Sequence, residues 1–170
     1  ALPDFIAGLG PAQRHGEILA EVSRLERSIE EVFAAPAVPA VDPARWQDFS
    51  VDKWETTIFD VIPAARLLEF AFPTNRLYQS VQDHAPDETP PAIEWPAREE
   101  SWVLVYRKDW IVWRSPCEYE EAQILRDLMR GRPLGASIES ALEDPRARVD
   151  VVTTSIARWW GGSSTRWRAT

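Results

Sequence analysis

Residues 101–117 read SWVLVYRKDWIVWRSPC, and this stretch decides the predicted fold. Two apolar runs, 102–106 and 110–113, flank the polar triplet Arg107, Lys108 and Asp109. Aromatic and β-branched residues around a short polar break are typical of a β-hairpin. Because side chains alternate along a strand, the first strand has apolar residues on both faces, so we expect both to be covered. The large aromatic residues either fill the core of a small domain or line a sheet edge that receives another chain.

The composition is that of an ordinary globular chain, with 45% hydrophobic and 27% charged residues among 170. No apolar run reaches the roughly 20 residues of a membrane helix, and the first residues do not resemble a signal peptide. The single cysteine, Cys117, fits a reducing compartment. We therefore expect a cytoplasmic protein. The net charge of −8 disfavours nucleic acid and membrane as partners, because both are anionic.

The residues before 90 predict a helical part. Apolar residues at steps of three and four, from Ile18 to Val32, predict a long helix over 12–34. Asp42 and Pro43 are typical of a helix start. Further helices are expected over 46–49, 63–72 and around 77–81, and residues 54–59 are extended or helical.

A proline-rich and acidic stretch at 83–98 predicts a domain boundary, which separates a helical domain at 1–90 from a second domain at 91–170. After the hairpin we expect a helix at 118–130 that ends at Gly131, a second from Pro133, and a third from Asp144. The predicted fold is α+β, an N-terminal helical part followed by a small antiparallel sheet with three helices, as in winged-helix domains. One face of the third helix is apolar: Val149, Val152, Ile156, Trp159 and Trp160.

The sequence predicts no catalytic residue, no metal ligand and no cofactor in this chain. His15 and His84 lie in different segments, and neither is spaced like a metal ligand relative to Cys117 or to a pair of acids. Cys117 has no histidine placed to activate it. The acids Glu118, Glu120 and Glu121 are explained by a favourable interaction with a helix dipole.

We therefore expect a binding protein. A peptide would add a strand to the edge at 110–114 and rest its side chains against the third helix. The candidate peptide-binding residues are Trp110, Ile111, Val112, Trp113, Arg114, Ile156, Trp159 and Trp160. Four arginines are candidates for pairing with acids on the peptide: Arg114, Arg146, Arg148 and Arg158.

The segment 118–142, EYEEAQILRDLMRGRPLGASIESAL, resembles the helix–Gly–helix segment of the precursor-recognition domains (RiPP recognition elements, RRE) that serve ribosomally made, modified peptides. In those domains three strands precede three helices, and a leader peptide binds as an added strand between the sheet edge and the third helix. The resemblance therefore implies leader-peptide recognition.

A longer resemblance covers most of the chain. The stretches 2–36, 62–73 and 102–115 are similar to the HvfC/BufC-type family, whose members act beside a TIM-barrel metalloenzyme that modifies cysteines of a ribosomal peptide. On this resemblance we expect the chain to lack the family's N-terminal region, which is often labelled a putative DNA-binding domain. Where the family commonly has His-Pro in mid-chain, this sequence has Ile62 and Pro63, so no role of that histidine transfers.

Within that family the length and the Trp-rich hairpin are most similar to the small subunit of methanobactin biosynthesis. This resemblance implies two partners: an MbnB-like iron oxygenase, which holds the iron, and an MbnA-like precursor peptide, whose cysteines become oxazolone–thioamide groups. The chain itself would be non-catalytic. Aromatic residues of the N-terminal half, which are equally candidates for the core, would dock the partner: Trp46, Phe49, Trp54, Phe70 and Phe72.

The alternative is a winged-helix DNA-binding regulator. The three-helix unit and the arginines near the C-terminal end permit this function. The net charge of −8 and the bulky apolar face of the third helix disfavour it, because few side chains would remain to contact base edges.

Overall fold

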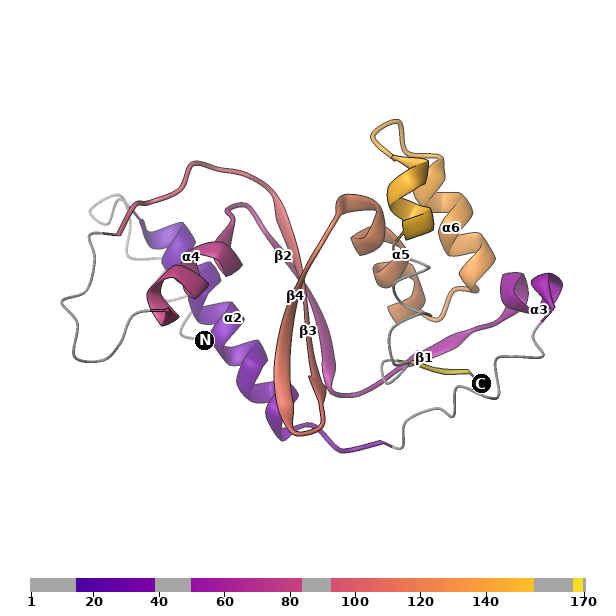
Figure 1. Ribbon diagram of the computed structural model, residues 1–170, viewed down its shortest axis with the longest axis horizontal. Coiled ribbons are helices and arrows are strands. Elements are labelled where there is room, and N and C mark those ends of the chain that lie inside the picture. The colour runs from indigo at the N-terminus through magenta and orange to yellow at the C-terminus, as the bar shows by residue number, and fades with distance from the viewer. Residues whose placement is uncertain (1–14, 39–49, 84–92, 155–166, 170) are drawn as a thin grey trace.

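A computed structural model describes residues 15–38, 50–83, 93–154 and 167–169. A three-stranded antiparallel sheet, in the order β2-β3-β4, stands between two groups of helices (Figure 1). Helices α2 and α4 lie on one side of it and α5 and α6 on the other. The fold is thus α+β, as the sequence predicts. The elements are α2 Gly16–Ala34, α3 Val51–Thr56, β1 Phe59–Val61, β2 Ala65–Phe70, α4 Thr74–Gln82, β3 Ser101–Lys108, β4 Ile111–Cys117, α5 Tyr119–Met129, α6 Leu134–Leu142 and β5 Trp167–Ala169.

The predicted hairpin is present as β3 and β4, but its turn is displaced. Arg107 and Lys108 extend β3, and the turn consists of Asp109 and Trp110. Both have positive φ, at 50° and 65°, as the two central residues of a type I′ turn do. The prediction that the second strand begins at Trp110 is therefore wrong by one residue, because a two-residue turn of this type continues the twist of the strands.

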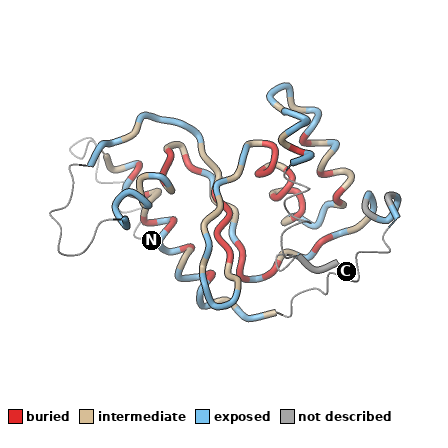
Figure 2. The backbone as a smooth tube through the Cα atoms, in the orientation of Figure 1, coloured by how far each residue is buried: buried red, intermediate tan, exposed pale blue. Residues whose placement is uncertain are grey.

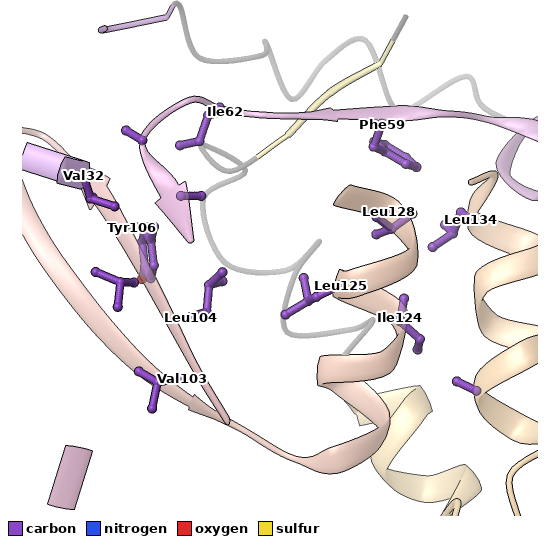
Figure 3. Close-up of a cluster of buried hydrophobic side chains, with 14 of the residues drawn as sticks. Val32, Phe59, Ile62, Val103, Leu104, Tyr106, Ile124, Leu125, Leu128 and Leu134 are labelled. Atoms are coloured by element: carbon purple, nitrogen blue, oxygen red, sulfur yellow. The ribbon is translucent and has the colours of Figure 1, made fainter. Parts of the chain in front are cut away.

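Strand β3 is the centre of the core, and the expectation that both of its faces are covered is confirmed. Val103, Leu104 and Val105 are all buried. Leu104 points to the side of Leu125 in α5, whereas Val103 points to the opposite side (Figure 3). The buried segments of Figure 2 accordingly gather where the sheet meets its helices. This two-sided burial makes β3 the strand on which the rest of the chain packs.

The predicted helix at 63–72 is wrong. Residues Ala65–Phe70 form strand β2, which pairs antiparallel with β3 from Ala65 opposite Tyr106 to Phe70 opposite Ser101. The segment contains good helix formers, but pairing with a buried strand outweighs intrinsic propensity here. The sheet therefore gains a third strand from the N-terminal half.

The remaining predictions for the N-terminal half have mixed outcomes. Helix α2 and a helix through residues 77–81, α4, are confirmed. Residues 54–59 divide between the end of α3 and the start of β1. β1 pairs with β5, an association that local sequence patterns do not predict. The predicted helix at 46–49, with its start at 42–43, lies outside the described residues.

Backbone pairing crosses the predicted domain boundary at residue 90. Strand β2 precedes that position and β3 follows it. One hydrophobic cluster also contains residues from both sides, such as Leu25 and Val32 from α2 and Ile124 from α5. The two halves share a sheet and a core, and the division into domains at 1–90 and 91–170 stays a prediction.

The helices after the hairpin follow the prediction except for the third. Helix α5 ends before Gly131, which has the left-handed φ of 76° expected at this position. Residues 144–147 form turns, and the third helix is observed from 149 to 154. Val152 is buried whereas Val149 is exposed, so these two do not share one buried face. Ile156, Trp159 and Trp160 lie outside the described residues.

Among the described residues, no helix is both long enough and apolar enough to cross a membrane.

Candidate functional site

Strand β4 forms one edge of the three-stranded sheet, as the sequence predicts. It pairs with β3 on its inner side, and within the described parts of the chain no strand pairs with its outer side. The outer side of an edge strand presents backbone N–H and C=O groups that another extended chain can bind. This edge is therefore the first candidate for a binding site.

A hydrogen bond on the other side of β3 shows which groups of β4 point outward. The N–H of Arg107 donates to the C=O of Ala64 at 3.0 Å, so it points away from β4. Arg107 lies opposite Val112, which makes this a pair without mutual hydrogen bonds. Because such pairs alternate along an antiparallel ladder, the backbone groups of Val112 and Arg114 point to the open edge.

The same alternation explains Pro116. Pro116 lies two positions after Arg114 in β4, and it is opposite Val103. Because backbone groups of every second residue point to the same side of a strand, the nitrogen of Pro116 also faces outward. Proline has no N–H to donate and is tolerated only where no ladder bond is lost. The edge therefore offers two N–H donors, at Val112 and Arg114, and three carbonyl acceptors, at those residues and at Pro116.

Two large apolar side chains flank this edge. Ile111 is 56% exposed and Trp113 is 49% exposed. Trp113 lies opposite Tyr106, so both residues belong to the α5 side of the sheet. An extended chain that paired with β4 would place every second side chain next to these two residues.

On the other side of the sheet, Arg114 connects β4 to α4. Its guanidinium donates to the side-chain oxygens of Asn75 at 3.1 Å and Gln79 at 2.5 Å. It also lies 4.5 Å from the centre of the Tyr78 ring, a cation–π contact. These partners are neutral, so the contacts described for Arg114 hold it in place without cancelling its charge.

The hairpin tip is anchored to the end of α2. The guanidinium of Arg107 donates to the carbonyls of Phe33 and Ala35 and lies 5.3 Å from the Trp110 ring centre. These carbonyls are at the C-terminal end of α2, where a positive charge is favourable. Trp110 itself is 74% exposed. Aspartate at position 109 tolerates a left-handed backbone, which is a local signal for this turn.

Two of the arginines predicted to pair with acids on a peptide are already paired within the chain. Arg146 contacts Asp144 at 3.3 Å and its guanidinium lies 4.0 Å from the Tyr119 ring centre. Arg148 contacts Glu118 at 2.6 Å and Glu120 at 3.3 Å. Whether these two pair with acids on a peptide stays a prediction, and Arg158 lies outside the described residues.

Glu120 does more than interact favourably with the helix dipole, which is the role predicted from the sequence. The carboxylate is buried, and its Oε1 accepts hydrogen bonds from the backbone N–H of Arg148 at 2.7 Å and from the Arg148 Nε at 3.3 Å. The other oxygen is buried without a hydrogen-bond partner among the described residues, as is the Nε1 of Trp102. Glu120 thus fastens the segment after α6 to the first turn of α5.

Asp144 is expected to stabilise the fold above about pH 4 and to lose this effect at lower pH. Hydrogen bonds from Arg146 and Tyr119 hold the pKa of Asp144 well below its usual range. A carboxyl group whose pKa is lower in the folded than in the unfolded chain stabilises the fold at pH values above the unfolded pKa of about 4. This contribution declines as the pH falls below about 4. The melting temperature of Asp144→Asn relative to wild type should therefore be lowest near pH 6 and approach the wild-type value toward pH 2. A constant difference across this range would contradict the expectation.

The described residues contain no group of three or more His, Cys, Asp or Glu side chains that could hold a metal ion. His15 stacks on Trp95 with the ring centres 3.8 Å apart. His84 lies outside the described residues. Cys117 is half-buried, and its thiol contacts the carbonyl of Ser115 at 3.6 Å. No catalytic arrangement is visible in these contacts.

The predicted docking aromatics do not form one described surface. Phe70 is 2% exposed and belongs to the core, so its side chain does not lie on the described surface, and its docking role stays a prediction. Phe72 is half-buried, with the guanidinium of Arg98 5.5 Å from its ring centre. Trp54 lies in α3. Trp46 and Phe49 lie outside the described residues.

Comparison with protein-family models gives no match for this chain, and comparison with curated proteins gives none either.

Proposed function

We propose that this chain is the non-catalytic, peptide-recognising subunit of a heterodimeric iron-dependent oxygenase that modifies a ribosomally made peptide. The open edge of β4 carries the proposal. It combines outward backbone groups at Val112 and Arg114 with the exposed side chains of Ile111 and Trp113. An edge of this kind binds extended peptides through main-chain hydrogen bonds and selects them through side-chain contacts.

The order of elements supports the same function. Three antiparallel strands, β2 to β4, precede α5, α6 and the helical stretch 149–154, as in the precursor-recognition domains described above, although α4 lies between β2 and β3 here. The sequence resemblance to the MbnC type of the HvfC/BufC family adds the partner and the substrate. The partner is an MbnB-like iron enzyme in the cytoplasm, and the substrate is an MbnA-like precursor whose cysteines become oxazolone and thioamide groups of the copper chelator methanobactin.

The subunit's task is to bring the substrate close to the partner's iron. A leader peptide held on β4 raises the effective concentration of the core cysteines at the partner's active site. No residue of this chain is required to bind iron for that task. DNA binding is less well supported, because Arg146 and Arg148 pair with carboxylates in the described structure, which reduces the positive charge that they offer to phosphates.

Co-purification followed by titration tests the proposal. The chain is co-expressed with an MbnB-like enzyme, and the purified complex is titrated with a fluorescent MbnA-like leader while anisotropy is recorded. We expect a one-to-one complex that binds the leader, and oxidation of the precursor by the complex but not by this chain alone. Oxidation by the isolated chain, or failure of the two proteins to associate, would overturn the proposal.

A further inference from the structure

A cavity of about 240 Å³ opens at the tip of the hairpin, beside the end of α2. Figure 1 shows this tip next to the last turn of α2 and the segment that follows it. The cavity wall is partly polar and partly apolar, and its two charged side chains, Arg107 and Asp109, belong to the hairpin. The lining residues are Pro36, Ala37, Val38, Ile62, Ala64, Arg107, Asp109 and Trp110.

Trp110 has a backbone conformation that does not suit it. Its φ of 65° is left-handed, a conformation that is unfavourable for an L-residue with a side chain, and glycine or asparagine is favoured in such turns. The ring is nevertheless largely exposed at 74%. Although the Arg107 guanidinium lies 5.3 Å from the ring centre, the residue stays largely exposed, so a contact with another molecule is the better explanation for tryptophan at this position.

The charges at the cavity favour a basic ligand. Both terminal nitrogens of Arg107 donate to carbonyls at the end of α2, and that helix end offsets the positive charge. Glu31, near the same helix end, pairs with Arg27 at 2.8 Å and lies 3.9 Å from Arg66. Asp109 is exposed, and no ion pair of its carboxylate is found in the described part of the chain. Asp109 therefore supplies the uncompensated charge at the rim.

We propose that this cavity binds a lysine or arginine side chain of the peptide that pairs with β4. The aliphatic stem lies against Pro36, Val38 and Ile62, and the positive head group meets the carboxylate of Asp109. The site rests on the proposed function, because the peptide reaches the tip by continuing beyond Ile111. The net charge of −8 also favours a positively charged ligand.

Selection from random peptides tests this site. A phage library of random 12-residue peptides is panned against the full-length wild-type chain, Asp109→Asn and Val112→Pro. Asparagine tolerates positive φ, so Asp109→Asn removes the charge and keeps the turn. We expect the wild-type pool to combine alternating apolar residues with one lysine or arginine at a fixed position. The Asp109→Asn pool keeps the alternation and loses the basic residue, and the Val112→Pro pool loses both.

Direct affinities complete the test. The best wild-type peptide is compared with a version that carries norleucine in place of its basic residue. We expect Asp109→Asn to weaken the basic peptide about 3- to 5-fold and to leave the norleucine peptide unchanged. Trp110→Gly should weaken both peptides and raise the urea midpoint of the chain, since glycine relieves the turn. Tighter binding together with higher stability would contradict a role for Trp110 in recognition.

The two proposals fail in different ways. Suppose that the wild-type pool has alternating apolar residues but no basic residue, and that the alternation is lost with Val112→Pro. This result overturns the cavity site and supports peptide pairing at the edge of β4. A basic preference that persists in Asp109→Asn overturns the site as well. A pool unaffected by Val112→Pro overturns the edge as the place of peptide pairing, and a wild-type chain that selects no peptide overturns both.

Discussion

Proline in place of Val112 is expected to weaken leader binding at least about tenfold while the chain stays folded. The N–H of Val112 points to the open edge, so proline removes a donor that an added strand needs and puts its ring in the way. A loss of about 1.4 kcal/mol corresponds to tenfold in affinity. Anisotropy titration of a fluorescent leader measures the effect, and urea unfolding measures stability. We expect a stability cost of about 1–2 kcal/mol, because Val112 packs against the core only in part.

Two matched variants assign this loss to the backbone. Val112→Thr keeps the N–H and the β-branched shape, so binding should remain within about twofold of wild type. Trp113→Pro removes an N–H that points toward β3, so it should destabilise the hairpin itself. If Val112→Thr weakened the leader as strongly as Val112→Pro, side-chain packing rather than strand addition would explain binding at this position.

Alanine in place of Glu120 is expected to lower the free energy of unfolding by about 2–3 kcal/mol. The substitution leaves the backbone N–H of Arg148 without its acceptor and creates a cavity at a side chain that is 1% exposed. The segment between α6 and the third helix would lose its attachment to α5. Urea unfolding at pH 7, followed by circular dichroism, measures the change.

Glu118 provides the control, because it pairs with the same arginine from an exposed position. Its carboxylate contacts Arg148 at 2.6 Å, and its side chain is 62% exposed. An exposed ion pair contributes about 0–1 kcal/mol, so Glu118→Ala should have a small effect. Glu120→Gln keeps an acceptor oxygen and should fall between the two alanine variants. Equal losses for Glu118→Ala and Glu120→Ala would show that burial is not what makes Glu120 important.

The hairpin and the helices that follow it were predictable because their signals are local. A strand with apolar residues at every position from 102 to 106 has to be buried on both faces, and β3 is. Gly131 ends α5 for a reason visible in the sequence, since glycine accepts the left-handed conformation at low cost. Asp144 followed by proline is likewise a local signal, and it predicts the start of a helix. In the structure the carboxylate instead caps a turn, because it accepts a hydrogen bond from the N–H of Arg146 at 2.9 Å.

The candidate site was predictable in part. Aromatic residues on a strand that lies at a sheet edge were expected, and β4 is that edge. The residues of α4 that hold Arg114 were missed, because a helix 35 and 39 positions earlier gives no local sign that it faces this strand. The cavity at the tip was missed for the same reason, since its walls come from three separate segments.

The sequence by itself determined that residues 101–117 form a hairpin, which of its strands is buried on both faces and that the helices around it have an apolar side, because each depends on residues a few positions apart. Only the tertiary structure decided that 65–70 is a strand, since its helix formers lose to pairing with β3. The tertiary structure likewise decided which edge stays open and which arginines are already paired. Arg148 pairs with Glu120, which lies 28 residues earlier in the chain, and the open edge of β4 depends on the order of the strands. Neither property can be predicted from residues that are close together in the sequence.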